Sequence, residues 1–349
     1  MALPTLQREL SSQRVGDATS DLRLGPTNLG EVFRRADLSD DLAAVERILQ
    51  ERTASKARLL ADAGAHTVAA GGKRLRAALV LLAARLGNYE LARAARPAVA
   101  IEMLHAASLV HDDLVDHALR RRGRVTVHAR WDSHVALMLG DYFFAVSANE
   151  LAAEPDPRII RFYADAARTV VEGELRPVTQ LEPIDIALAQ YRYKIGCKTA
   201  ALFEAACKAG IAVAGGAPEQ IEALGQFGYD LGLAFQIVDD VLDFTGDEVM
   251  LGKPAGNDLR EGTLTLPLIY AVSQSDEPLL RELAHTARPD PADVPQLVTA
   301  VLEAGGAERA MDEARQTVAR ALTHLTTFPR SSAMYGLGDI CDFVLNRQV

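Results

Sequence analysis

The segment LVHDDLVDHALRRRG, residues 109–123, holds three aspartates and a run of three arginines in otherwise helix-forming sequence. Its acidic half, HDDLVD at 111–116, recurs as VDDVLD at 238–243. Residues four apart in a helix lie on the same face, so the first and last aspartate of each motif project together. Apolar sequence precedes both motifs, EMLHAASLV at 102–110 and GLAFQI at 232–237. We therefore expect the two acidic turns to end core helices and to face each other across a cavity.

A single motif of this kind is more often a solvated acidic helix face, because burying like charges without a cation is costly. Two of them, each at the end of an apolar helix, favour a metal site. Oxygen ligands alone suit Mg²⁺, which commonly bridges carboxylates and substrate phosphates. Zinc would require a tetrahedral set of His or Cys, which the sequence does not offer. The pattern predicts a magnesium site.

Basic residues accompany the acidic ones. GGKRLRAAL, residues 71–79, places Lys73, Arg74 and Arg76 after a glycine pair at a predicted helix start, and Arg121 and Arg122 follow the first acidic motif. Helix N-termini favour anions, and Lys and Arg side chains complete a phosphate site. The glycine spacing of a P-loop is missing. The combination suits a reaction that joins two diphosphate-bearing molecules.

Composition bounds the class of protein. The chain has 349 residues, 49% hydrophobic and 24% charged, with few aromatic residues and no long alternating run of β-branched residues, so helices are favoured. A net charge of −10 argues against nucleic acid as a partner. The three cysteines Cys197, Cys207 and Cys341 lack metal-like spacing, and no signal segment or run of about 20 apolar residues is present. These features indicate a cytoplasmic protein that touches a membrane at most transiently.

We expect two parts in the chain. Residues 1–39 form a leader, partly disordered or loosely packed, and 40–349 form a single catalytic domain of successive helices. The expected breaks between helices contain Pro, Gly or Asp, and they are EPDP at 154–157, GGAP at 215–218, SDEP at 275–278 and RPDPADVP at 288–295. The predicted fold is an all-α, large helical bundle.

From about residue 40 to the C-terminus the sequence resembles the trans-isoprenyl diphosphate synthases, or polyprenyl synthetases. The motifs that carry the resemblance are GGKRLR, EMLHAASLVHDDLVDHALRRRG, LMLGDYFFA, KTAALFEAA, FQIVDDVLDFTGD and GKPAGNDLREGTLTLPLIYA. Their order and spacing are those of the family. The resemblance implies the isoprenoid synthase type I fold, which encloses a deep central cavity, and usually a homodimer.

The family's functional residues map onto matching positions of this chain. Its aspartate motifs map to Asp112, Asp113, Asp116, Asp239, Asp240 and Asp243. Asp112, Asp116, Asp239 and Asp243 are the implied metal ligands, for about three Mg²⁺ ions per active site. The implied contacts to the allylic diphosphate are Arg121, Lys198, Thr199, Gln236 and Lys253, and those to isopentenyl diphosphate are Lys73, Arg76, His105 and Arg122. His111, next to Asp112, is interpreted as a histidine that packs between helices.

The resemblance also bears on product length. Ala107 and Ser108 lie five and four residues before Asp112, about one helical turn deeper in the cavity. Bulky aromatic residues there stop the chain at farnesyl or geranylgeranyl length in the family. Small residues therefore favour a longer product of about thirty to fifty carbons, as for a quinone side chain, unless a deeper side chain such as Met103 closes the tunnel. A short-chain synthase remains the alternative.

Two further alternatives stay open. A class I terpene cyclase would share the fold and one aspartate motif, but VDDVLD and GGKRLR speak against it. A non-catalytic subunit of a hetero-oligomeric synthase should have lost aspartates, whereas all six are present.

Overall fold

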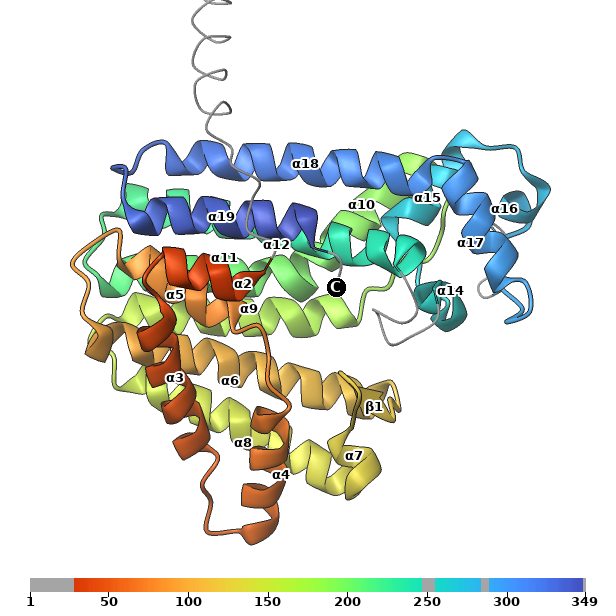
Figure 1. Ribbon diagram of the computed structural model, residues 1–349. Coiled ribbons are helices and arrows are strands. Elements are labelled where there is room, and N and C mark those ends of the chain that lie inside the picture. Colours follow the sequence, from red (N-terminus) through yellow and green to blue (C-terminus); the bar gives the residue numbers. More distant parts are fainter. Residues whose placement is uncertain (1–27, 247–254, 284–288, 348–349) are drawn as a thin grey trace, which may run out of the picture.

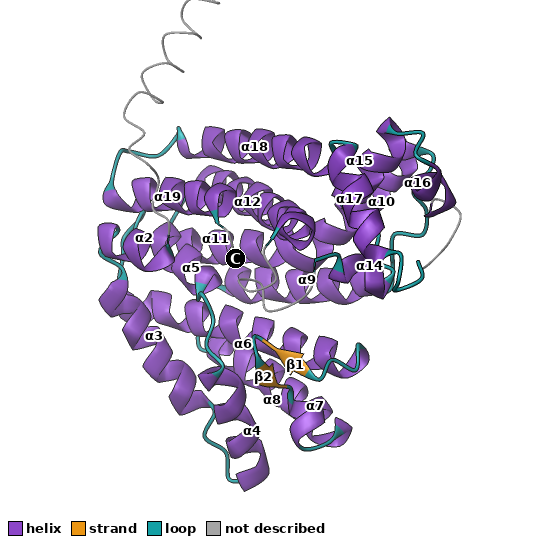
Figure 2. Cartoon of the chain, turned by 45° about the vertical axis from the view of Figure 1, so that its right-hand side comes forward, coloured by secondary structure: helices purple, strands orange, loops and turns teal. Residues whose placement is uncertain are grey.

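The computed structural model describes residues 28–246, 255–283 and 289–347, and it is almost entirely helical (Figures 1 and 2). In the N-terminal half the helices are α2 (Leu29–Arg35), α3 (Ser39–Arg52), α4 (Arg58–Ala69), α5 (Leu75–Ala84), α6 (Leu91–Val115), α7 (Val127–Arg130), α8 (Ser133–Ala152) and α9 (Pro157–Glu174). The later ones are α10 (Ile184–Ile195), the π-helical turn η1 (Gly196–Ala200), α11 (Ala201–Val213), α12 (Pro218–Thr245), α14 (Asn257–Glu261), α15 (Leu266–Gln274), α16 (Pro278–Leu283), α17 (Val294–Glu303), α18 (Gly306–Leu325) and α19 (Ser332–Asn346). The all-α prediction is confirmed.

Proline sets several helix starts. Pro157, Pro218 and Pro278 are the first residues of α9, α12 and α16. The N–H at the first helical position makes no hydrogen bond within the helix, so proline, which lacks it, loses nothing there, and its fixed φ suits the helix. These prolines lie in three of the four breaks that we expected from the sequence. The chain therefore turns where the pattern predicted it.

The two helices that carry the aspartate motifs are the longest of the described part. The first motif ends α6, and the second lies near the end of α12. α6 packs against α8 and α5, and α12 packs against α11 and α18, so both are central (Figure 1). α18 and α19 run side by side above α12, whereas α3 and α4 project on the other side of the molecule (Figure 1).

Two features depart from the expected pattern. α2 falls inside the expected leader, and Leu29, Val32 and Leu38 are buried, so the packed chain begins before residue 40. Residues 1–27 lie outside the described part. A short ribbon, β1 (Arg120–Arg121) and β2 (Arg124–Val125), follows the first motif, where no strand was expected.

Candidate active site

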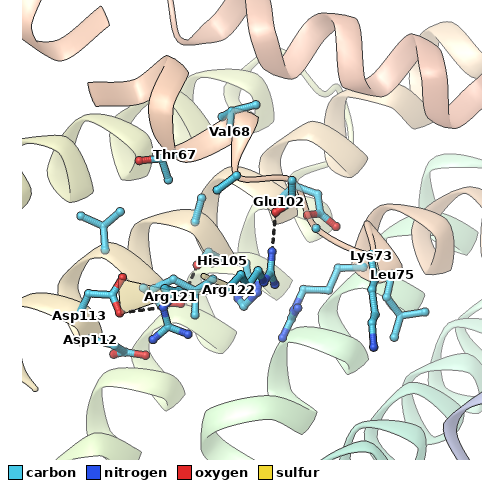
Figure 3. Close-up of a pocket in the computed structure, with 18 of the residues that line it drawn as sticks. Thr67, Val68, Lys73, Leu75, Glu102, His105, Asp112, Asp113, Arg121 and Arg122 are labelled. Atoms are coloured by element: carbon cyan, nitrogen blue, oxygen red, sulfur yellow. Dashed lines mark hydrogen bonds and ion pairs between the residues drawn. The ribbon is translucent and has the colours of Figure 1, made fainter. Parts of the chain in front are cut away.

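One large cavity of about 710 Å³ opens between the ends of the two motif helices. It collects side chains from α5, α6, the β ribbon, η1 and α12. The predicted site residues that line it are Lys73, Arg76, His105, Ser108, Asp112, Asp113, Arg121, Arg122, Lys198, Thr199, Gln236 and Asp239. Figure 3 shows the aspartates of α6 on one side of this cavity, Lys73 on the other, and Arg121, Arg122 and His105 between them.

Asp112 is a partly buried carboxylate in the cavity wall. Burial raises the pKa of Asp112 to about 6, against the opposing charge of Lys198. Lys198 lies in the π-helical turn and its Nζ is 3.0 Å from Glu174 Oε1 on α9. Such turns are frequent at functional sites, because the extra residue redirects side chains. Asp112, Glu174 and Lys198 thus leave more negative than positive charge at this end of the cavity.

The ribbon fixes the two arginines that follow the motif. Arg121 pairs with Arg124, and the turn between them has positive φ at both Arg122 (50°) and Gly123 (75°). This is the conformation of a two-residue hairpin turn, which glycine readily adopts. The Nε atom of Arg121 lies 2.7 Å from Asp113 Oδ1, and the guanidinium of Arg122 donates to the carbonyl of Gly71. The ribbon therefore connects the acidic motif to the glycine pair before α5.

The opposite end of the cavity is basic. Burial lowers the pKa values of Lys73, Arg76 and Arg122, and neighbouring cations lower them further. Arg76 Nε and His105 Nδ1 are buried and, within the described residues, without a hydrogen-bond partner. Burial and the nearby arginines also lower the pKa of His105, so its imidazole is neutral at pH 7. These cations lower one another's pKa values, and unsatisfied polar atoms lie beside them. Such a group favours the binding of an anion.

The three aspartates of the second motif have different surroundings. Asp239 lines the cavity and its Oδ1 lies 2.7 Å from Arg347 Nη2. Asp240 is buried and accepts hydrogen bonds from Tyr191 (2.6 Å) and Gln236 (2.9 Å). Asp243 is buried as well, and its Oδ2 accepts from the backbone N–H of Asp258 at the start of α14. Asp239 therefore faces the cavity, while the other two hold neighbouring elements.

Of the predicted residues that the structure describes, four do not line the cavity. Asp116 is exposed at the C-cap of α6. Asp240 and Asp243 are buried away from the cavity wall. Ala107 is fully buried one turn before His111, whose Nε2 lies 3.2 Å from Leu137 O on α8. Since residues four apart share a helix face, Ala107 faces α8 and Ser108 faces the cavity. Lys253 lies outside the described residues.

Thr199 and Gln236 form part of a chain of hydrogen bonds. Thr199 donates to Gln236 Oε1 at 2.8 Å, and Gln236 donates in turn to Asp240. Burial raises the pKa of Asp240 to about 7, and the Tyr191 hydroxyl opposes this increase. The chain orients the amide of Gln236 at the cavity wall.

The sequence reading missed several residues of the site. Glu102, buried on α6, accepts the N–H of Ala77 at 3.0 Å and lies 3.6 Å from Arg74, so it anchors the start of α5. Its one sequence signal is an acid within an apolar helical run. Tyr191, Glu174 and Arg347 come from elements far along the chain, where no local pattern marks them.

The donor set fits a hard divalent cation. Carboxylates predominate, and no described group of three His, Cys, Asp or Glu side chains is close enough to hold an ion by itself. Mg²⁺ typically takes one or two carboxylates, keeps several waters and completes its shell with substrate phosphates. The arrangement is therefore that of a site completed by its substrate.

Comparison with known proteins agrees with this geometry. Residues 57–301 match the family model described as Polyprenyl synthetase. The chain is 41% identical over 312 residues to heptaprenyl diphosphate synthase component 2 of Geobacillus stearothermophilus, covering 89% of this chain and 97% of that protein. It is 33% identical to the nonaprenyl diphosphate synthase of Mycobacterium tuberculosis, covering 92% and 96%. A polyprenyl synthase from Caulobacter crescentus, solved with calcium and isoprenyl diphosphate, superposes with a TM-score of 0.86 at 32% identity, covering 94% and 99%.

Proposed function

Because the chain belongs to the polyprenyl synthetase family, it is a prenyltransferase with the isoprenoid synthase fold, and we propose that it condenses isopentenyl diphosphate head to tail onto an allylic diphosphate. The primer is farnesyl or geranylgeranyl diphosphate and the product an all-trans polyprenyl diphosphate of C30–C50 length. The observation that carries this proposal is the shared cavity. It is lined by carboxylates of both motifs, Asp112 and Asp113 of the first and Asp239 of the second, and by a group of cations that includes Lys73 and Arg76.

The part of the cavity between the two aspartate motifs is the proposed allylic site. Asp112 and Asp239, which line it, together with Asp116 and Asp243 of the same motifs, would hold about three Mg²⁺ ions, which when bound would neutralise the diphosphate leaving group. A calcium complex of a family member supports a divalent metal there. Arg121, Lys198 and Lys253 add positive charge to the same leaving group. Because Lys198 already pairs with Glu174, it is held at the rim of this site before substrate arrives.

The basic end is the proposed isopentenyl diphosphate site, formed by Lys73, Arg76, His105 and Arg122. Neutral His105 can donate a hydrogen bond to a phosphate oxygen without adding a buried charge. The allylic carbon–oxygen bond breaks as diphosphate leaves, and the double bond of isopentenyl diphosphate attacks the resulting carbocation. A proton is then lost to the departing diphosphate. Pre-positioned cations stabilise the charge that develops on that diphosphate.

Ser108 and the deeper Met103 both line the cavity, so the proposed chain-length wall is formed by α6. The small side chain at 108 leaves room for a growing chain, which supports a medium or long product. The relatives named heptaprenyl and nonaprenyl diphosphate synthases support the same range. A short-chain product is the alternative if Met103 closes the cavity.

We also propose a homodimer. Leu137, Met138 and Phe144 of α8 are 43%, 38% and 46% exposed, an apolar face that a second copy would cover. The relative named component 2 raises a hetero-oligomer as the alternative. The molar mass of the pure protein in solution, measured by light scattering, separates these. No helix in the described ranges is long and apolar enough to cross a bilayer, and a cytoplasmic location remains part of the proposal.

The decisive experiment incubates pure protein with Mg²⁺, labelled isopentenyl diphosphate and either primer, then sizes the products by chromatography. We expect label in polyprenyl diphosphates, and loss of incorporation when Mg²⁺ is chelated. Absence of incorporation by the pure protein would overturn the proposal. Release of a cyclic hydrocarbon from the allylic diphosphate alone would favour a terpene cyclase.

A further inference from the structure

The segment from Val115 to Val125, here called the strap, runs from the end of the first motif helix through the β ribbon at the rim of the cavity (Figures 1 and 2). Its apolar side chains are unusually exposed. Val115 is 75% exposed, Leu119 70% and Val125 38%. Leu175, which follows the lining residue Glu174 along the chain, is 81% exposed. Large apolar side chains exposed beside a cavity indicate a contact surface.

The charge of this region opposes that of the rest of the chain. Residues 117–131 contain five arginines and no acidic residue, in a protein whose net charge is −10. Arg121 is engaged with Asp113, and Arg122 with the carbonyl of Gly71. Arg120 and Arg124 are both exposed; Arg120 donates to the carbonyl of Gly123 within the turn, and Arg124 lines the edge of the cavity. The strap is thus a locally basic surface on an acidic protein.

Basic and apolar side chains are interleaved on the strap. Arg120 is paired across the ribbon with Val125, so their side chains share a face, and Leu119 precedes Arg120. Side chains of both kinds at one edge suit a lipid interface, where cations meet anionic headgroups and apolar groups enter the acyl boundary. Two copies meeting strap to strap would bring like charges together, which disfavours a second copy as the occupant.

We propose that the strap docks the cavity mouth onto an anionic lipid surface. The choice of a lipid surface rests on the proposed function, since a polyprenyl product has a long apolar tail that has to leave the cavity. Docking there lets the tail pass into lipid without crossing water. The contact is peripheral and electrostatically assisted, so it weakens as salt rises.

The test is flotation of the full-length protein with vesicles, without substrate. Wild type should float with vesicles of phosphatidylcholine and phosphatidylglycerol and not with phosphatidylcholine alone. Each basic residue near an anionic surface strengthens partitioning about fivefold, so Arg120→Glu should weaken it about 25-fold. We combine it with Leu119→Ser, which removes an exposed apolar contact.

The matched control is Leu322→Ser/Arg315→Glu on α18, which changes a 37% exposed leucine and a 60% exposed arginine far from the mouth. The control should float like wild type. Failure of wild type to float with anionic vesicles would overturn the inference, as would equal flotation of Leu119→Ser/Arg120→Glu. A fall in molar mass of that variant would instead identify the strap as a protein interface and equally reject lipid.

Activity in detergent separates this inference from the proposed function. Flotation needs no turnover. A protein that floats but is inactive would overturn the synthase proposal and leave the lipid-binding strap supported. A protein that is active but does not float would overturn the lipid-binding strap and leave the synthase proposal supported. With both intact, Leu119→Ser/Arg120→Glu should keep its rate in detergent and lose stimulation by anionic vesicles.

Discussion

The guanidinium of Arg347, near the C-terminal end of the described chain, lies 2.7 Å from Asp239 of the second aspartate motif. It also donates to the carbonyl of Phe235 at 2.6 Å and lies 3.9 Å from the centre of that ring. The Arg347 side chain is 2% exposed, whereas that of Asp239 is 42% exposed. An arginine thus neutralises, in the metal-free protein, a carboxylate that we assign to the metal.

Arg347→Gln should therefore destabilise the metal-free protein by about 1–2 kcal/mol, a value reduced for the exposure of Asp239. Mg²⁺ with inorganic diphosphate should narrow this difference, because the ion supplies the missing positive charge. Thermal denaturation with and without Mg²⁺ and diphosphate measures both effects. Arg315→Gln, which breaks a surface ion pair on α18, should change stability little in either condition. A deficit that Mg²⁺ leaves unchanged would contradict the assignment of Asp239.

Asp112→Asn should inactivate the enzyme and stabilise its metal-free fold. Burial raises the pKa of Asp112 to about 6, above the ordinary value of 3.8. A raised carboxyl pKa contributes stability that is fully present below about pH 4 and is lost as the pH rises through 6. The neutral amide avoids that loss, so the variant should gain about 1–2 kcal/mol at pH 7.5, discounted for partial exposure, and nothing near pH 4.

Urea unfolding without Mg²⁺ at the two pH values measures this gain, and turnover should fall by about 10²–10³-fold. Asp165→Asn, at an exposed carboxylate of α9, serves as the control and should show neither effect. Normal turnover by the Asp112 variant would contradict its role at the metal. Equal stability at pH 7.5 would show that burial does not strain this carboxylate.

The limits of the sequence reading follow from which contacts are local. Helix breaks are local, because proline acts on its own backbone, and the breaks at 154–157, 215–218 and 275–278 were predicted. The aspartate motifs are local as well, since a period of four fixes a shared helix face. The β ribbon has strands of two residues, too short to show alternation, and its RRGR turn was the one available signal.

The residues that contact the motifs from distant parts of the chain could not be predicted from the sequence. Arg347 and Tyr191 meet the second motif from positions 108 and 49 residues away, and no periodicity connects such positions. Ala107 and Ser108 were both expected at the chain-length wall. Neighbouring residues lie about 100° apart around a helix, and that rotation directs Ala107 toward α8 and Ser108 into the cavity.

Tyr191→Phe should destabilise the protein more at pH 8.5 than at pH 6. The hydroxyl donates to Asp240 at 2.6 Å and so stabilises the ionised carboxylate, whose pKa burial raises to about 7. Its contribution is present where Asp240 is charged and shrinks as the pH falls through 7. A loss of about 1–3 kcal/mol is expected at the higher pH.

Tyr163→Phe is the matched control, because the Tyr163 hydroxyl donates at 2.7 Å to the carbonyl of Pro97, which does not titrate. Both hydroxyls are buried, so the two variants differ mainly in the acceptor. Urea unfolding should give a pH-dependent loss for Tyr191→Phe and a constant one for Tyr163→Phe. Parallel losses in both variants would show that Asp240 keeps one protonation state over this range.

Ser108→Phe should shorten the product toward farnesyl or geranylgeranyl length, because an aromatic ring at this position occupies the cavity beside α6. Ala107→Phe should leave the product near wild-type length but cost about 1–3 kcal/mol in stability, since its side chain is fully buried toward α8 and the ring must displace packed atoms. Product sizes by mass spectrometry, with thermal denaturation of both variants, measure the two effects separately. Thr323→Phe, exposed on α18, controls for the added ring. Products of wild-type length from Ser108→Phe would move the chain-length wall away from this face of α6, and equal stability of the two variants would show that the cavity extends between α6 and α8.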